Sequence, residues 1–284
     1  MPALVSKQNP FPVAIITDFG YRVHYVGAMK GVIASIAPRA NVIDITHGVV
    51  AQCIVAGAIA LRESWRYFPP RTVFLAVVDP GVGTARAPIA IETRAGARFV
   101  GPDNGLLWLA AKEAGIKRVV KLTSPLHRLS NVSATFHGRD IFAPAAAYLW
   151  RGTPISALGP ELRSSLPANS IVALELPRPT ESARELRGEV VYVDGFGNLV
   201  SNIDRRTAEQ FGSRFRHKSL SVRIKGGAAM GILHTYGHAP EGASLAIFGS
   251  FNLLEIAIRN GNAAAKFAAG PGTPVSVVAV ADRI

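Results

Sequence analysis

The stretch PVAIIT, Pro12 to Thr17, gives the first clear indication of the fold of this chain. It is a short apolar run rich in β-branched residues, and it ends abruptly at Asp18 and Gly20. A run of this kind predicts a buried strand whose carboxyl end is marked by polar and turn residues. Downstream, the segment Tyr25 to Ala37 carries apolar residues at helical intervals and stops before Pro38. The sequence therefore predicts a strand followed directly by a helix.

Strand and helix patterns keep alternating beyond this first pair. A second strand is expected at Asn41 to Ile45, a second helix at Val50 to Tyr67, and a third strand at Thr72 to Val78. This alternation predicts parallel βαβ units. Ligands of such sheets bind beyond the carboxyl ends of the strands. Asp18 and Asp79 follow two of these ends, and they are therefore the first candidates for a site.

The second part of the chain has a different pattern. Short strand-like runs alternate there with glycine-rich turns, at Gly188–Val193, Ser219–Ile224, Ser244–Phe248 and Val275–Val280. That pattern indicates a small, mainly antiparallel β-barrel. The predicted fold class is therefore α/β, with an N-terminal α/β domain over residues 1–176 whose sheet is mainly parallel. A polar, proline-bearing linker at 177–186 leads to a smaller C-terminal antiparallel β-barrel domain over 187–284.

The amino-acid composition limits the classes of protein to which this chain can belong. Of the 284 residues, 49% are hydrophobic and 18% are charged, which is typical of a globular chain with a real core. The net charge of +12 raises the question of nucleic-acid binding, but the basic residues are spread singly and form no aromatic–basic signature. We therefore expect no nucleic-acid partner. Cys53 is the sole cysteine, so no disulfide forms within the chain, and its apolar helical surroundings indicate a core position.

Neither a signal peptide nor a membrane span is expected. The N-terminal residues lack a long apolar core, and no apolar run reaches the length of a transmembrane helix. A single thiol is compatible with a reducing compartment, and we therefore expect a cytoplasmic protein without a membrane partner.

Four clusters place charged or hydroxyl side chains beside glycines, where the backbone can approach a ligand closely. They are Thr17–Gly20, Asp79–Thr84 with Arg86 close behind, Gly101–Gly105 and Thr135–Asp140. No phosphate-binding loop, dinucleotide fingerprint, serine-nucleophile elbow or metal-ligand spacing accompanies them, and no metal site is predicted. Metal ligation would rest on residue type alone, at Asp18, Asp79, Asp103, His137 and Asp140.

The sequence pattern alone also allows purely structural roles for these residues. Asp79 and Arg86 could equally form a structural ion pair. The other histidines, His47 among them, have no partner visible in the sequence and are interpreted as structural or surface residues.

Taken in order along the chain, the clusters and their neighbours resemble the S-adenosylmethionine hydroxide adenosyltransferase family, which is related to the fluorinases and chlorinases. The resemblance covers nearly the whole chain. Its motifs are ITDFG (Ile16–Gly20), YVGAMKGVI (Tyr25–Ile33), IDITH (Ile43–His47), VVDPGVGT (Val77–Thr84), FVGPDNGLL (Phe99–Leu107), TFHGRDIFAPAAA (Thr135–Ala147), YVDGFGNLVSNI (Tyr192–Ile203) and LLEIA (Leu253–Ala257).

The resemblance implies hydrolysis of S-adenosylmethionine to adenosine and methionine, with no cofactor and no metal. It also implies a homotrimer that binds this small-molecule substrate at its subunit interfaces. The hydroxide-using branch of the family carries an Asp–Arg–His set, which falls here on Asp79, Arg86 and His137. These positions differ in the halogenase branch, so the full set favours water over halide as the nucleophile. A halide-using transferase and a non-catalytic adenosine- or S-adenosylmethionine-binding protein are the alternatives.

The residue types suit the implied reaction. The sulfonium departs as a neutral thioether, so attack at the ribose C5′ needs a positioned and partly desolvated water in line with the C–S bond. His137 would orient that water and, if neutral, accept its proton. Asp79 would orient the set electrostatically, and Arg86 would stabilise hydroxide character. The backbone of Gly138 would add a donor.

The resemblance also implies contacts to the nucleoside part of the substrate. Asp18 matches the carboxylate that takes both ribose hydroxyls, and Asn198 matches a contact to the adenine edge. Phe196 lies in the same FGN stretch and is a further substrate-binding candidate. Tyr236 falls where the family places an aromatic ring against adenine.

At the methionine end, Asp194 and Ser250 match groups near the amine and the carboxylate. Three other positions depart from the family pattern. Val23 stands where an Asp usually helps to hold the amine, Gln52 where an aromatic residue is common, and Phe251 where the residue is often small or basic. These departures lead to the hypothesis that this member hydrolyses S-adenosylmethionine weakly or prefers a related 5′-substituted adenosine.

Overall fold

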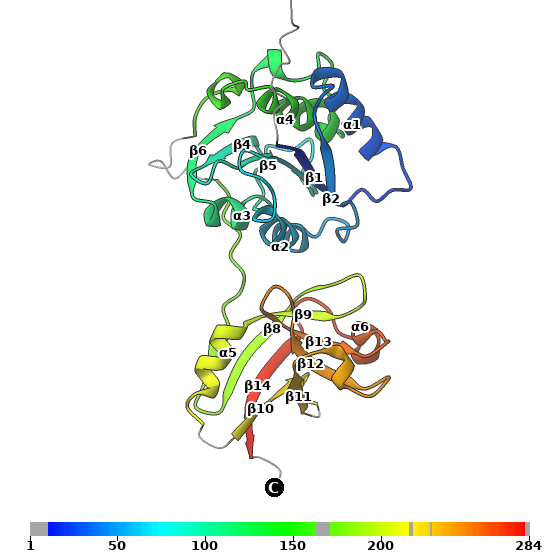
Figure 1. Ribbon diagram of the computed structural model, residues 1–284, viewed down its shortest axis with the longest axis vertical. Helices are drawn as coiled ribbons and strands as arrows, with labels where there is room; N and C mark the ends of the chain where they lie inside the picture. Colours follow the sequence, from blue (N-terminus) through cyan, green and yellow to red (C-terminus); the bar gives the residue numbers. More distant parts are fainter. Residues whose placement is uncertain (1–10, 163–170, 216–217, 228, 282–284) are drawn as a thin grey trace, which may run out of the picture. The chain divides into compact units, whose positions relative to one another are not determined.

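The computed structural model describes residues 11–162, 171–215, 218–227 and 229–281. The chain divides between Leu174 and Glu175 into two compact units, each with its own hydrophobic core (Figure 1). The N-terminal unit is an α/β structure and the C-terminal unit is a β-barrel, which confirms the predicted fold class. In the described residues, no helix combines the length and the apolar character that a membrane crossing requires.

The N-terminal unit is built on a sheet with the strand order β2-β1-β3-β5-β4-β6. Its strands are β1 Val13–Thr17, β2 Val42–Thr46, β3 Val73–Val77, β4 Pro88–Thr93, β5 Arg98–Pro102 and β6 Ile116–Lys121. β1 pairs in parallel with β2 and β3, and β3 does so with β5, whereas β4 runs antiparallel to β5 and β6. The carboxyl-terminal edge of this mainly parallel sheet therefore brings together the segments that follow β1, β2 and β3.

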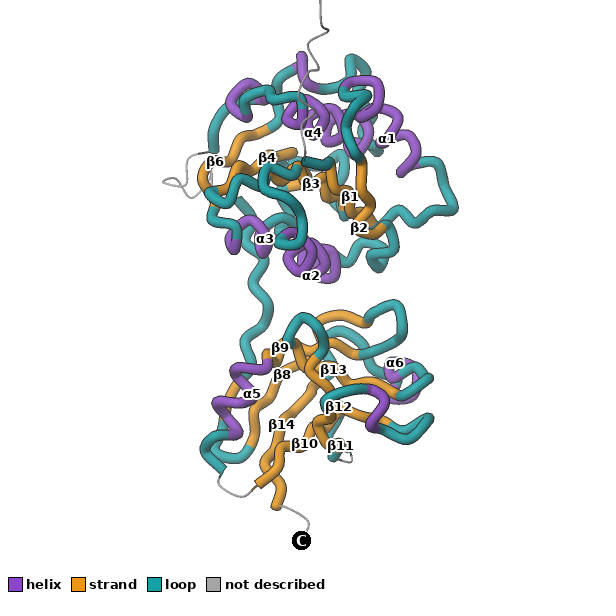
Figure 2. The backbone as a smooth tube through the Cα atoms, viewed as in Figure 1, coloured by secondary structure: helices purple, strands orange, loops and turns teal. Residues whose placement is uncertain are grey.

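Helices cover both faces of this sheet (Figures 1 and 2). The helices that contact each other on one face are α1 Tyr25–Ile36 and α4 Ala143–Trp150, and those on the other are α2 Ile54–Trp65 and α3 Trp108–Glu113. The connections contain the short helical turns η1 Pro125–His127, η2 Gly138–Phe142 and η3 Ile155–Leu158. Every residue of β1 and β3 is buried, which explains why both strands are continuous apolar runs in the sequence.

The second helix begins later than the sequence predicts. The pattern favours a helix over Val50–Tyr67, whereas α2 begins at Ile54. The backbone of Gln52 is left-handed, with φ +62°, and a right-handed helix cannot include such a residue. Cys53 is consequently the N-cap residue of α2 and is half-buried, so its predicted place inside the core is wrong.

In the C-terminal unit, seven of the described strands close into a barrel in the order β14-β10-β11-β12-β13-β9-β8, because β14 also pairs with β8. These strands are β8 Glu185–Val193, β9 Leu199–Asp204, β10 Lys218–Ile224, β11 Met230–Leu233, β12 Ser244–Phe248, β13 Leu253–Ile258 and β14 Pro274–Ala281. β11 and β12 run parallel, and the other neighbouring pairs run antiparallel.

Short elements complete this unit. They are β7 Thr180–Glu181, α5 Arg205–Gly212, η5 Tyr236–His238 and α6 Ala263–Phe267. β7 pairs with β8, so the stretch expected as a linker, 177–186, supplies β7 and the first residues of β8 to this sheet. Asp204 caps α5 by accepting a hydrogen bond from the Thr207 backbone N at 2.9 Å. Phe211 of α5 is fully buried in the barrel core.

Candidate active site

Three side chains that are distant in sequence meet beyond the carboxyl end of β3. Asp79 follows this strand, Arg86 precedes β4, and His137 directly precedes η2. Arg86 Nε donates to Asp79 Oδ1 at 2.8 Å, and Arg86 Nη2 donates to Asp79 Oδ2. Arg86 Nη2 also lies 2.8 Å from His137 Nδ1. The structure thus brings together the three residues that the sequence singles out, with the guanidinium at the centre.

A glycine turn explains how the two loops come together. Gly83 has φ +79°, a conformation that side chains with a Cβ rarely adopt. A Cβ at Gly83 would lie 2.6 Å from the carbonyl oxygen of Ala134, closer than real Cβ contacts. The absence of this atom lets the turn that begins at Asp79 pack against the segment that leads into His137.

The carboxylate and the guanidinium are buried together. The side chain of Asp79 is 4% exposed and that of Arg86 is 9% exposed, so each charge relies on the other for compensation. The Arg86 guanidinium carbon also lies 5.2 Å from the centre of the Phe142 ring. Arg86 Nη1 is buried and has no hydrogen-bond partner among the described residues. This nitrogen is therefore a buried donor whose hydrogen-bonding capacity the described residues leave unused.

The contact between Arg86 and His137 fixes the tautomer of the imidazole. A guanidinium only donates hydrogen bonds, so His137 Nδ1 accepts and the ring proton is on Nε2. Burial, and then the positive charge of Arg86, lower the pKa of His137, against the opposing effect of Asp79 and Asp140. His137 is therefore a neutral ring that presents Nε2–H. Because its Nδ1 lone pair is already engaged, this arrangement favours orienting a water over the proton-accepting role expected from the sequence.

Asp18 emerges at the same edge of the sheet. It follows Thr17, which pairs with Val77 of β3, so Asp18 leaves the sheet beside the segment that carries Asp79. Asp18 is half-buried, and its Oδ2 accepts a hydrogen bond from the backbone N of Gln52 at 2.7 Å. The left-handed backbone of Gln52, which delays the start of α2, is thus the feature that holds this carboxylate.

Three aromatic rings connect the Asp18 loop with the His137 loop. The ring of Phe19 lies 5.6 Å from that of Tyr25 and 6.1 Å from that of Phe136, centre to centre. Tyr25 and Phe136 complete the set at 5.0 Å, and all three contacts are edge-to-face. Such contacts add to the burial of the rings, so the residues that precede His137 and follow Asp18 form one packed layer.

In the C-terminal unit, the remaining candidates line one open pocket of about 960 Å³. The predicted residues found in this pocket are Asp194, Phe196, Asn198, Tyr236, Ser250 and Phe251. Phe196 is 81% exposed and Tyr236 is 42% exposed, so aromatic rings are available to a ligand. A pocket that combines aromatic walls with polar side chains suits a flat molecule with hydrogen-bonding edges, such as a nucleobase.

Asp194 organises one wall of this pocket. Its Oδ1 accepts hydrogen bonds from the backbone N of Phe196 at 2.9 Å and of Asn198 at 2.8 Å. Its Oδ2 accepts from Asn198 Nδ2 at 2.9 Å. Asp194 therefore holds the turn that presents Phe196, while Asn198 Oδ1 accepts no hydrogen bond from the part of the chain that the structure describes.

Glu255 is a polar residue of the pocket that sequence reasoning missed. It is 7% exposed, and its Oε2 accepts from the Tyr236 hydroxyl at 2.8 Å. A Cβ at Gly249 would overlap this carboxylate, so the close approach depends on glycine. Burial and the nearby charge of Asp194 raise the pKa of Glu255. A charged residue inside the apolar strand run LLEIA was the available signal.

Glu255 is expected to destabilise the fold at neutral pH. A carboxyl whose pKa is raised by folding costs stability as the pH rises from its unfolded pKa through its folded pKa. Glu255→Gln keeps an acceptor for Tyr236 and removes the charge, so its melting temperature should exceed that of the parent at pH 7.5. The gain should shrink towards pH 4. Glu209→Gln, at a side chain that is 66% exposed, is the control. An equal gain at both pH values would contradict this account.

Comparison with known proteins identifies the family. The model of the SAM hydroxide adenosyltransferase N-terminal domain matches residues 13–159, and that of the C-terminal domain matches residues 188–276. The chain belongs to the SAM hydroxide adenosyltransferase family. The (R)-S-adenosyl-L-methionine hydrolase of Thermus thermophilus is 38% identical over 274 residues, which cover 94% of this chain and 99% of that protein.

Other known proteins are similar to this chain over most of their length. The (R)-S-adenosyl-L-methionine hydrolase of Salinispora tropica is 38% identical over 268 residues, or 94% of this chain and 97% of its own. The fluorinase of an Actinoplanes species is more distant, at 28% identity over 75% of this chain and 76% of its own. The crystal structure of a conserved Thermotoga maritima protein matches with a TM-score of 0.83 and 35% identity, covering 94% of this chain and 99% of its own.

Of the three positions that depart from the family pattern, Val23 and Gln52 belong to the N-terminal unit and Phe251 belongs to the C-terminal unit. Val23 is 47% exposed in the loop between β1 and α1. Gln52 holds Asp18 through its backbone, and Phe251 lines the C-terminal pocket.

The other residues considered as metal ligands have separate partners. Asp103 Oδ1 accepts from the Val172 backbone N at 2.8 Å, and the buried Asp140 pairs with Arg139 at 2.6 Å. Within the described ranges, no group of three or more His, Cys, Asp or Glu residues is arranged to hold a metal ion.

Proposed function

We propose that this protein hydrolyses S-adenosyl-L-methionine to adenosine and L-methionine. The observation that carries the proposal is the convergence of Asp79, Arg86 and His137, with a neutral imidazole and an unpaired guanidinium nitrogen in one place. Relatives at 36–38% identity that bear the name (R)-S-adenosyl-L-methionine hydrolase support it. The full set of three residues favours water over halide as the nucleophile.

In the proposed reaction, a water attacks the ribose C5′ while the C5′–S bond breaks and the sulfonium leaves as a neutral thioether. The proton that the attacking water loses passes to solvent, so the products are adenosine, methionine and one proton. Arg86 Nη1 and His137 Nε2–H are the donors available to the oxygen, and they would hold it as negative charge develops. Asp79 fixes the guanidinium by two hydrogen bonds, so the donor is oriented before substrate arrives. The leaving group already carries positive charge, so neither metal nor cofactor has a step to perform.

Substrate binding is assigned to the residues at the two surfaces described above. Asp18 would accept hydrogen bonds from the ribose hydroxyls, while Asn198, Phe196 and Tyr236 would take adenine. Asp194 and Ser250, two further residues of the C-terminal pocket, would bind the methionine part of the substrate. A homotrimer in the cytoplasm, with substrate at each subunit interface, is part of the proposal, and light scattering coupled to gel filtration tests the oligomeric state.

The direct test is incubation of the purified protein with S-adenosylmethionine in chelator-treated buffer, followed by chromatography. Adenosine and methionine are expected in equal amounts. A 5′-halo-5′-deoxyadenosine formed in chloride or fluoride would replace the proposal with a halide-using transferase. Tight binding without product would replace it with a binding protein. Parallel assays with other 5′-substituted adenosines decide the substrate preference.

Activity is expected to persist into mildly acidic solution. His137 must stay neutral to accept from Arg86, and its pKa is lowered by burial and by that guanidinium. His137 is therefore protonated only at a pH below the ordinary pKa of histidine. The acid limb of kcat/KM should accordingly lie below about pH 6.5. A series of initial rates from pH 5 to pH 9 measures it. An acid limb above pH 7 would contradict a neutral His137.

A further inference from the structure

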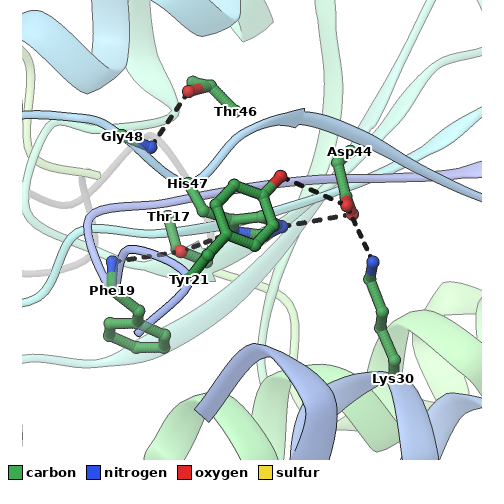
Figure 3. Close-up of polar contacts among 8 residues, drawn as sticks. All are labelled: Thr17, Phe19, Tyr21, Lys30, Asp44, Thr46, His47 and Gly48. Carbon is green, nitrogen blue, oxygen red and sulfur yellow. Dashed lines mark hydrogen bonds and ion pairs between the residues drawn. The ribbon is translucent and has the colours of Figure 1, made fainter. Parts of the chain in front are cut away.

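A buried histidine outside the proposed catalytic set has partners on both ring nitrogens. His47 follows β2 and is fully buried. Its Nδ1 lies 2.7 Å from the hydroxyl of Thr17 at the end of β1, and its Nε2 lies 3.1 Å from Oδ1 of Asp44 on β2 (Figure 3). Thr17 is fully buried as well. The motif IDITH, which carries Asp44 and His47, has no part in the proposed chemistry.

The surrounding donors define where the protons lie. The backbone N–H of Phe19 donates to Thr17 Oγ1 at 3.2 Å, and the carboxylate beside His47 Nε2 can only accept, which makes His47 Nδ1 the acceptor of the Thr17 hydroxyl proton. The ring proton of His47 then lies on Nε2 and faces Asp44. Neither His47 Nε2 nor Asp44 Oδ1, both of which are buried, makes a hydrogen bond to a described residue, so the 3.1 Å approach between them is a close electrostatic contact. Hydroxyl, imidazole and carboxylate therefore form one chain, joined by a hydrogen bond at Thr17 and by an electrostatic contact at Asp44.

Asp44 anchors this chain to a helix and to a loop. Lys30 Nζ of α1 donates to Asp44 Oδ2 at 2.7 Å, and the Tyr21 hydroxyl lies 3.4 Å from the same oxygen (Figure 3). Burial alone would raise the pKa of Asp44, but the contacts to Lys30 and His47 lower it. The carboxylate is therefore charged and can hold His47 in a single orientation.

The chain ends at the loop that carries Asp18. His47 contacts this loop on both sides of the carboxylate. Before Asp18 it bonds to Thr17, and after Asp18 its carbonyl oxygen accepts from the Gly20 backbone N at 2.8 Å. The ring of Tyr21 meets the His47 ring edge-on at 5.0 Å.

We propose that the Thr17–His47–Asp44 chain positions the Asp18 carboxylate for the ribose hydroxyls of the substrate. This inference rests on the proposed function, because that function gives Asp18 its ligand. His47 and Asp44 are positioning residues in this view and touch no reacting atom. Gln52 fixes one oxygen of Asp18 through its backbone, and the chain fixes the direction from which Asp18 leaves β1.

The test compares Thr17→Val with Thr17→Ser. Valine keeps the shape and removes the hydroxyl, whereas serine keeps the hydroxyl. Thr17→Val should weaken adenosine binding and raise KM for S-adenosylmethionine about tenfold, as expected for one lost buried hydrogen bond that orients a ligand group. Its kcat should stay within about threefold of the parent, because the Asp79–Arg86–His137 set is untouched. Thr17→Ser should keep the adenosine affinity and the KM for S-adenosylmethionine close to those of the parent. Asp44→Asn provides a second variant, with the same direction of change, in case Thr17→Val folds poorly.

A double-variant measurement separates positioning from general structural damage. In an Asp18→Ala background, Thr17→Val and Asp44→Asn should weaken adenosine binding by no further amount, because the group they position is gone. For the same reason, neither should weaken binding of 2′,3′-dideoxyadenosine by calorimetry.

Two outcomes overturn parts of the argument separately. If Thr17→Val and Asp44→Asn cost as much without Asp18 as with it, the positioning role is wrong. If Asp18→Ala itself leaves adenosine binding unchanged, the proposed ribose site is wrong and the positioning role falls with it.

Discussion

His137→Ala is expected to lower kcat/KM for S-adenosylmethionine by about 10²- to 10⁴-fold, the range for loss of a positioned group that acts on the reacting oxygen. The variant removes the Nε2–H donor while both hydrogen bonds between Arg86 and Asp79 remain possible. The buried charges therefore stay paired, and the melting temperature should change little. Initial rates of adenosine formation, with a thermal melt of each protein, measure both effects.

His127→Ala is the matched control. His127 lies in the same unit, its Nδ1 is 2.9 Å from the Ser124 hydroxyl, and its ring packs edge-on against Tyr148. His127→Ala thus loses comparable local contacts and none of the proposed catalytic residues, so its rate should match that of the parent. A His137→Ala enzyme that keeps more than about a tenth of the parental rate would contradict the assigned role.

Gly83→Ala is expected to abolish most activity through the backbone, without removing any reacting group. The new Cβ would lie 2.6 Å from the Ala134 carbonyl oxygen and would sit on a residue with φ +79°. The turn that carries Asp79 must then move away from the segment that precedes His137. We expect a loss of at least about 10²-fold in kcat/KM, since small displacements of positioned groups have effects of this size. The stability loss should be about 1–3 kcal/mol.

Gly152→Ala isolates the backbone contribution of such a change. Gly152 has φ +97°, but a Cβ there would meet nothing within 4 Å. It should therefore lose comparable stability to backbone strain and keep its activity. Chemical denaturation and initial rates of both variants give the comparison. Equal activity in Gly83→Ala and Gly152→Ala would mean that the two loops tolerate separation, and the convergence of the three side chains would then be dispensable.

The elements that the sequence predicts correctly are those that their own residues identify. β1 and β3 are buried on both faces, so their apolar runs identified them, and the turn after each gave the first candidate residues. The start of α2 could not be predicted, because Gln52 is left-handed where its backbone N bonds to Asp18, 34 residues earlier. A contact of that range leaves no trace in a window of neighbouring residues.

The same limit applies to the candidate site. Motif order pointed to Asp79, Arg86 and His137, but which nitrogen of His137 carries the proton follows only from where the Arg86 guanidinium lies. The roles of His47 and Glu255 were not predicted because the hydroxyl groups that bond to them, those of Thr17 and Tyr236, are 30 and 19 positions away along the chain. The sequence left His47 open as a structural or a surface residue, and the structure shows it fully buried.

The buried pairing of Asp79 with Arg86 also bears on how relatives of this protein diverge. Substituting either residue alone leaves the other as an unpaired buried charge, which lowers the free energy of unfolding by about 3–5 kcal/mol. A domain of ordinary stability, about 5–15 kcal/mol, loses a large share of its margin in that step. Lineages that adopt another nucleophile should therefore exchange both positions together or through a neutral intermediate at one of them. Ancestral sequences reconstructed between the hydrolases and the fluorinases are expected to show few chains that keep one of these charges without the other.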